Sequence, residues 1–226
     1  MDGGLATLGS AAIAFAGSHM AMSGPLRRGL RRSLGERGFL LAYTLVSLAT
    51  LTALIVAFAR TAPGTALWNG AATAPWVGAS LLTLLALALV LGSFGGNPAM
   101  VNGKLGGLHS RKPWGVFKVT RHPLMMGIAL WALAHILVAP TPRSLVLCGT
   151  LIVLALLGSH FQDRRKLAQF RGEWQAWMDR TSFWPRWRAL PRMGVIWGVA
   201  PLVWLLLTWG HRWANGIPAG IWRWVH

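Results

Sequence analysis

The chain has 226 residues, of which 54% are hydrophobic and only 12% are Asp, Glu, Lys or Arg, about half the charged share usual in a soluble domain. Its net charge of +17 would suit nucleic-acid binding, but the basic residues stand in short clusters between long apolar runs, as in membrane loops. We therefore expect a protein of the lipid bilayer that binds no nucleic acid. The single cysteine, Cys148, excludes a disulfide framework and a cysteine-based zinc site.

Six apolar segments approach the length of about 20 residues that a membrane-spanning helix needs. They are Leu5–Met22, Phe39–Ala59, Trp76–Phe94, Leu124–Val138, Leu145–His160 and Met193–Trp209. The fourth and fifth are short, and we expect them to extend into their flanks. Pro140 and Pro142 predict a tight turn between these two, and hence an antiparallel helix pair. The sequence thus predicts an all-α, polytopic membrane helix bundle that forms a single domain over residues 1–226.

The distribution of Lys and Arg predicts the orientation of the helices. Of the 22 Lys and Arg residues, all lie in the loops after the first, third and fifth segments except Arg60, Arg143, Arg212 and Arg223. Because cytoplasmic loops are enriched in Lys and Arg, we expect these three loops in the cytoplasm. Both termini should then lie on the outer side of the cytoplasmic (inner) membrane. The N-terminus carries no basic residue before its apolar run, which predicts a retained helix rather than a signal peptide.

Two connecting segments have distinct compositions. Gly95–Val119 is rich in glycine, and we expect an irregular loop that folds back on the bundle. Gln162–Met178 is predicted as an amphipathic helix at the membrane interface, with Asp163, Glu173 and Asp179 paired to basic neighbours. An interfacial position, where the ring is buried and the N–H stays hydrated, is also expected for Trp174, Trp177, Trp184, Trp187, Trp222 and Trp224.

Histidines in the apolar segments are candidate functional residues, because ionisable side chains are costly in lipid. His19 lies in the first segment, His135 in the fourth, and His160 at the inner end of the fifth. Each has two open interpretations, a hydrogen bond to a neighbouring helix or ligation of a metal or haem. No carboxylate lies in mid-membrane, so His19 and His135 suit an axial pair on haem better than a four-ligand zinc site.

A second candidate site is Arg121-His122-Pro123, where the fourth segment begins. Pro at the start of a helix lacks an N–H that would be unpaired there in any case. The free amides of the first turn and the flanking cations would favour an anion.

Three groups of residues combine into a more specific pattern. The first is Gly17-Ser18-His19-Met20 with Arg27, Arg28 and then Leu34-Gly35-Glu36-Arg37-Gly38; the second is Val119-Thr120-Arg121-His122-Pro123 with Gly127, Trp131 and Ala134-His135; the third is Asp163-Arg164-Arg165-Lys166. Together they resemble the NnrU family of membrane proteins over about residues 5–190. The sixth helix and an amphipathic tail over residues 193–226 lie beyond the resemblance.

The resemblance implies a cofactor and a chemistry. The family includes proteins associated with nitrite and nitric oxide reduction (denitrification) and the 15-cis-zeta-carotene isomerase of carotenoid biosynthesis, a haem b enzyme. It implies haem b, with His19 and His135 as axial ligands of the iron, Arg27 and Arg121 as cofactor-binding cations, and supporting catalytic roles for His122 and His160. The implied activity is a redox-gated cis-trans isomerisation of an apolar polyene.

Two alternatives remain. One is a non-catalytic membrane factor that assists nitrogen-oxide reductases through a membrane protein partner. The other is a methyltransferase that uses S-adenosylmethionine, because residues 121–127 are similar to the Arg-His-Pro-x-Tyr-x-Gly motif of isoprenylcysteine carboxyl methyltransferases. Here Met125 replaces the Tyr, and Asp163-Arg164-Arg165-Lys166-Leu167 lacks the acidic pair of their Glu-Glu-x-x-Leu motif.

Overall fold

The computed structural model describes residues 3–100, 103 and 106–225, and these residues form helices without any strand. The prediction of an all-α bundle is therefore confirmed. The helices are α1 (Gly3–Ser23), α2 (Arg27–Arg60), α3 (Thr73–Ser93), α4 (Pro123–Val138), α5 (Pro142–Gln169), α6 (Arg171–Arg180) and α7 (Ile196–Asn215), with short 3-10 turns η1 (Gly115–Lys118), η2 (Trp187–Met193) and η3 (Gly220–Arg223).

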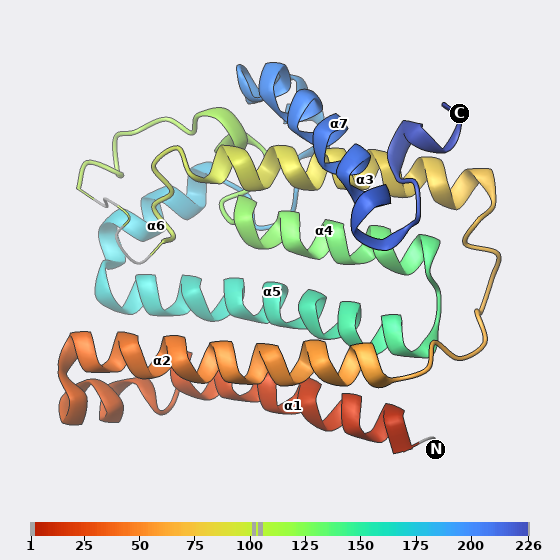
Figure 1. Cartoon of the computed structure of the whole chain (residues 1–226). Coiled ribbons are helices and arrows are strands. Elements are labelled where there is room, and N and C mark those ends of the chain that lie inside the picture. Colours follow the sequence, from red (N-terminus) through yellow and green to blue (C-terminus); the bar gives the residue numbers. More distant parts are fainter. Residues whose placement is uncertain (1–2, 101–102, 104–105, 226) are drawn as a thin grey trace.

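The long helices run side by side, with α5 in the middle (Figure 1). α5 packs against α1 on one side and against α4 on the other, while α3 packs against both α4 and α7. The turn between α1 and α2, the junction of α5 with α6, and the segment between α3 and α4 all lie at one end, on the left in Figure 1. These connections carry most of the basic residues, and we call this the basic end of the bundle.

The six predicted apolar segments all fall on helices. Among the described helices, α1, α2, α3 and α5 are long and apolar enough to cross a bilayer. α4 has 16 residues; at about 1.5 Å per residue it is some 24 Å long, shorter than a bilayer core of about 30 Å. η2 and α7 meet at a bend of 93° and would form a further span if they act as one unit. This arrangement agrees with about six spans, although Met193 belongs to η2 rather than to the last helix.

The predicted antiparallel pair of the fourth and fifth segments is present. Pro142 occupies the first turn of α5, and the Thr141 side chain caps this helix by accepting a hydrogen bond from the Ser144 N–H. Pro has no N–H to leave unpaired in a first helical turn, so the Pro140–Pro142 stretch ends one helix and starts the next.

The predicted interfacial helix over residues 162–178 is wrong. α5 continues to Gln169, because residues 162–169 contain neither Gly nor Pro to end it. The helix breaks only at Phe170, whose backbone leaves the helical region at φ −139° and ψ 53°, and α6 then begins. The basic and acidic residues after the fifth segment are thus divided between the end of one long helix and a separate short one.

The glycine-rich segment between α3 and α4 folds back on the bundle as predicted, for the part that the structure describes (residues 95–100, 103 and 106–119). Leu108, Val116 and Phe117 are buried in the main apolar core. Gly92 makes this approach possible, because a Cβ there would lie 2.3 Å from Cγ1 of Val116. The Trp114 indole N–H also donates to the carbonyl of Gly95 at 3.1 Å, which closes the loop on itself.

Two of the tryptophans predicted at the interface lie in the core. Trp174 and Trp177 on α6 are fully buried, whereas Trp184 and Trp187 are more than half exposed. The Trp177 ring lies 5.4 Å from the ring of Trp114, which belongs to the refolded loop. The loop therefore covers the aromatic face of α6, and this is why the interfacial prediction fails for these two residues.

α3 and α4 are in close contact at Gly127. A Cβ on Gly127 would lie 2.7 Å from the carbonyl oxygen of Ala86 and 2.7 Å from Cγ2 of Val90. Such close contact of small residues is a main source of helix association in lipid, where apolar burial gives little driving force.

Replacing Gly127 with Ala should therefore lower the free energy of unfolding by about 1–3 kcal/mol, because the added methyl group overpacks the contact. Gly149→Ala on α5 is the matched control, since a Cβ there meets no atom within 4 Å; it should be neutral or stabilising by up to about 1 kcal/mol. Thermal unfolding of the detergent-purified variants measures both. Equal effects in the two variants would contradict the close contact of α3 with α4.

Candidate functional site

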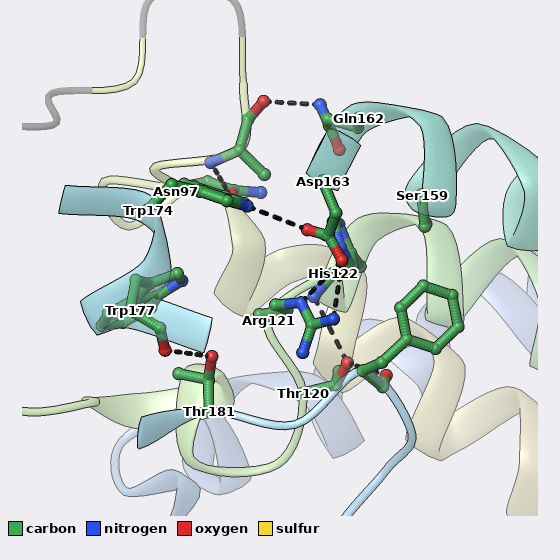
Figure 2. Close-up of polar contacts among 12 residues, drawn as sticks. Asn97, Thr120, Arg121, His122, Ser159, Gln162, Asp163, Trp174, Trp177 and Thr181 are labelled. Carbon is green, nitrogen blue, oxygen red and sulfur yellow. Dashed lines mark hydrogen bonds and ion pairs between the residues drawn. The ribbon is translucent and has the colours of Figure 1, made fainter. Parts of the chain in front are cut away.

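The main candidate site is a buried cluster around the carboxylate of Asp163 (Figure 2). Its Oδ2 accepts hydrogen bonds from Nε and Nη2 of Arg121, at 2.8 and 2.6 Å. Its Oδ1 accepts from Nε2 of His122 at 2.9 Å and from the indole N–H of Trp174 at 3.2 Å. The three polar side chains of Arg121, His122 and Asp163 are each at most 10% exposed. We call these four residues the Asp163 cluster.

Three segments bring the cluster together. Arg121 and His122 immediately precede α4, where Pro123 sets the first helical turn and keeps His122 out of helical conformation. Asp163 projects from α5 and Trp174 from α6. The segment after α6 also holds the backbone at Arg121, because the backbone N–H of Arg121 donates to the carbonyl of Ser182 at 2.8 Å.

Thr120, the residue before Arg121, is also hydrogen-bonded to the segment after α6. Its hydroxyl donates to the carbonyl of Phe183 at 2.8 Å and accepts from the N–H of His122 at 3.3 Å. The Arg-His-Pro motif is thus clamped between α5 and the segment that follows α6.

The charges of the cluster balance without a charged histidine. The guanidinium of Arg121 neutralises the carboxylate through two N–H groups that both donate to Oδ2, and hydrogen bonds between charged partners are among the stronger ones in proteins. With Nε2 of His122 donating to Asp163, its Nδ1 carries a lone pair. That Nδ1 is buried and has no hydrogen-bond partner. An unsatisfied buried polar atom costs about 1–3 kcal/mol, so this nitrogen marks the place where a ligand would complete the structure.

A cavity of about 780 Å³ lies beside the cluster at the basic end. Its lining includes His122 and the two residues that follow Pro123, Leu124 and Met125, together with Phe94 and Met100. Gln162 also lines it, and its side-chain N–H donates to the carbonyl of Ala99, another lining residue, at 2.5 Å. This volume falls within the range of about 300–1,000 Å³ typical of cofactor and small-molecule sites.

His160 is not hydrogen-bonded to the cluster. Its side chain is exposed and lines a second, smaller cavity of about 440 Å³. Arg121 and Asp163 lie on the wall of the same cavity, so His160 shares a surface with the cluster without joining it.

His19 and His135, the two histidines predicted as axial ligands, share one local geometry. Nδ1 of His19 bonds the carbonyl oxygen of Phe15 at 2.9 Å, and Nδ1 of His135 bonds that of Trp131 at 2.8 Å. Since a carbonyl oxygen only accepts, Nδ1 is the donor in both rings and Nε2 keeps its lone pair. This is the tautomer that a ligand of a metal or haem iron requires.

The structure does not bring these two histidines together. His19 lies four residues from the end of α1 at Ser23, at the basic end, and its ring contacts Tyr43 of α2 at 5.5 Å. His135 lies near the opposite end of α4, three residues before Val138. α5 separates α1 from α4 (Figure 1). No contact between the two side chains is present in the described part of the chain, and their role as an axial pair stays a prediction.

The remaining predicted residues have separate partners. Arg27, the first residue of α2, places its guanidinium 5.0 Å from the ring centre of Phe39. Glu173 accepts from both the backbone N–H and the ring of His109, at 2.7 and 2.8 Å, and these hydrogen bonds lower the pKa of the Glu173 carboxyl. Within the described part of the chain, no three His, Cys, Asp or Glu side chains gather to hold a metal ion.

Trp174 is the member of the Asp163 cluster that the sequence did not indicate. Its burial and its hydrogen bond to Asp163 depend on the end of α5 at Phe170, where no Gly or Pro predicts a helix end. A signal for Asp163 itself was present, because acids are only five of the 226 residues and this one follows directly on an apolar helix.

Comparison with known proteins identifies the family. A family model described as NnrU protein matches residues 7–219. The chain belongs to the NnrU family. The match includes the whole Asp163 cluster, and it continues through α7, beyond the residues that carry the resemblance in the sequence. Searches of curated proteins and of solved structures found no match.

The Asp163 cluster predicts a large effect of Asp163→Asn in this NnrU-family protein. Loss of the carboxylate leaves Arg121 buried without a counter-charge, which should cost about 3–5 kcal/mol of stability. Thermal unfolding in detergent measures the effect. Asp179→Asn is the control, because Asp179 is exposed and accepts only from its neighbour Gln175. If Asp163→Asn were as stable as Asp179→Asn, the ion pair would contribute nothing to the fold.

Proposed function

We propose that this NnrU-family membrane protein binds a ligand in the cavity beside the Asp163 cluster, with His122 as the side chain that contacts the ligand. The observation that carries the proposal is the buried, unpartnered Nδ1 of a histidine that also lines the cavity. A structural histidine in a helix bundle ordinarily has partners for both ring nitrogens, because an unpaired one is costly.

The chemistry of His122 follows from its partner. A carboxylate that accepts from one imidazole nitrogen fixes the tautomer and the orientation of the ring, and so the direction of the other nitrogen. Such a histidine serves either as a ligand of a metal or haem iron or as a general base. Arg121 keeps the Asp163 carboxylate ionised and in place, and it acts on the ligand only through Asp163 and His122.

Haem b is the ligand that we propose, from the family resemblance and from the character of the cavity. The lining contributed by Phe94, Leu124 and Met125 suits the apolar face of a porphyrin. Arg111, which also lines the cavity, provides a cation for a propionate. When bound, haem would supply a redox-active iron, which the implied isomerase chemistry on a polyene requires. His19 and His135, which lie on helices with α5 between them, stay the alternative axial pair.

A methyltransferase remains the second candidate, because the cavity adjoins the residues similar to that enzyme class. Met125 lines the cavity at the position where those enzymes have a Tyr. Asp163 is the one acid in the second motif, and its carboxylate already accepts hydrogen bonds from Arg121, His122 and Trp174. No acid of that motif is therefore left to hold S-adenosylmethionine, and haem b is favoured.

The test is the visible spectrum of the detergent-purified protein after expression with ample haem supply. We expect a Soret band and a pyridine haemochrome of haem b in the wild type, and loss of the band in His122→Gly. Added imidazole should restore it by filling the space of the lost ring. His160→Ala is the control and should keep the wild-type spectrum, because its ring is exposed and outside the cluster.

Other outcomes separate the alternatives. A band that survives in His122→Gly but is lost in His19→Ala or His135→Ala would contradict the assignment to His122 and support the axial pair implied by the resemblance. A flat wild-type spectrum would exclude haem b, and binding of labelled S-adenosylmethionine or recovery of a membrane protein partner in mild detergent would then distinguish a methyltransferase from an assembly factor.

A further inference from the structure

Two arginines from distant parts of the sequence meet at the basic end of the bundle without an acid between them. Arg165 of α5 donates from Nη1 to the carbonyl of Ser23, the last residue of α1, at 3.0 Å. Arg27, the first residue of α2, is joined to Ser23 by a tight turn in which its backbone N–H donates to the carbonyl of Gly24, so it lies beside the carbonyl that Arg165 binds. The Nε of Arg27 is buried and has no hydrogen-bond partner.

The acids of the described part of the chain are all engaged elsewhere. Glu36 pairs with Arg31, and Asp163 with Arg121 and His122. Glu173 bonds His109, and Asp179 accepts from Gln175. Two neighbouring cations with an unsatisfied buried N–H favour a bound anion, because an anion satisfies the donor and removes the repulsion.

The fold also determines where this anion would lie. Gly35 interrupts α2 with φ 68° and ψ 178°, a conformation that favours glycine, and the kink separates a short basic helix, residues 27–34, from the apolar part of α2. That short helix exposes Leu34 and, together with the preceding Leu26, presents apolar side chains beside Arg28 and Arg32. A helix of this composition lies in the headgroup region of a bilayer.

We infer that Arg27 and Arg165 form a binding site for the phosphate of an anionic membrane lipid. The site lies between the α1–α2 turn and the end of α5, at the depth where the short basic helix meets lipid headgroups. Arg suits this role because its planar guanidinium donates two parallel N–H bonds to phosphate oxygens. The apolar tails of the same lipid would lie along the exposed leucines of α2, among them Leu41 and Leu45. The site uses none of the residues of the His122 cavity, so it holds whether or not haem b binds there.

The experiment titrates phosphatidylglycerol into the delipidated full chain in a zwitterionic detergent and follows the midpoint of thermal unfolding. We expect phosphatidylglycerol to raise the midpoint and phosphatidylcholine with the same acyl chains to leave it nearly unchanged. Arg27→Gln and Arg165→Gln should each weaken the apparent affinity at least tenfold, because each loses charge-assisted hydrogen bonds to the phosphate worth about 1.5–3 kcal/mol, and about 1.4 kcal/mol corresponds to tenfold. Each variant is compared with its own lipid-free midpoint, so that a change in basal stability does not enter.

Arg28→Gln is the matched control, because Arg28 is exposed on the same short helix and its loss changes the net charge equally. It should keep nearly the wild-type affinity. An equal loss in Arg28→Gln, or an equal response to phosphatidylcholine, would overturn the proposal. Inorganic phosphate at the same concentration is the last comparison: a shift as large as that from phosphatidylglycerol would show a site for free phosphate and overturn the assignment to a lipid.

Discussion

The arrangement of the basic end depends on one buried carboxylate. Asp163 lies where α5 leaves the apolar part of the bundle, and it is only 4% exposed. A carboxylate removed from water must be paired and hydrogen-bonded, or its charge is prohibitively costly. The donors that meet this need come from three places in the chain: Arg121 and His122 before α4, and Trp174 on α6. Because each of them must reach the same two oxygen atoms, the start of α4 and the position of α6 relative to α5 are determined together.

The same constraint places the candidate site. The Asp163 carboxylate orients His122 and leaves its other ring nitrogen, Nδ1, buried without a hydrogen-bond partner. A local defect of this kind, held in place by a rigid surround, is typical of a functional position rather than of a structural one. Gln162, the residue before Asp163, lines the cavity beside it and bonds Ala99 in the lining, so one turn of α5 contributes both to the cluster and to the cavity.

In the middle of the bundle, close contacts at two glycines position the helices relative to one another. Gly127 lets α4 approach α3, and Gly92 lets Val116 of the refolded loop approach the end of α3. Both contacts would be closed to a larger residue. They position the N-terminal half of α4, and hence the Arg-His-Pro motif that starts this helix, relative to the loop that lines the cavity. The N-terminal half of α4 is therefore positioned in two ways: by the glycine contact with α3, and by the hydrogen bonds from Arg121 and His122 to Asp163.

Much of the fold was predictable because lipid imposes simple demands on a sequence. Long apolar runs identified the helices, two prolines identified the α4–α5 turn, and glycine content identified the refolded loop. The Arg-His-Pro motif and the NnrU family were also evident from local residues. The predicted helix over residues 162–178 failed because a helix end at Phe170 leaves no compositional signal. The burial of Trp174 and Trp177 was missed because their cover comes from a loop some 60 residues away.

By itself, the sequence determined which residues form helices, which end of the bundle is basic and to which family the chain belongs. These properties depend on local hydropathy, local charge and short motifs. Only the tertiary structure decided which polar groups meet. It joined His122 to Asp163 across 41 positions of the chain and Arg165 to Ser23 across 142, and it kept His19 and His135 on helices with α5 between them. The reason is that spacing along a helix gives the depth of a side chain, whereas the direction in which it points depends on which helices pack together.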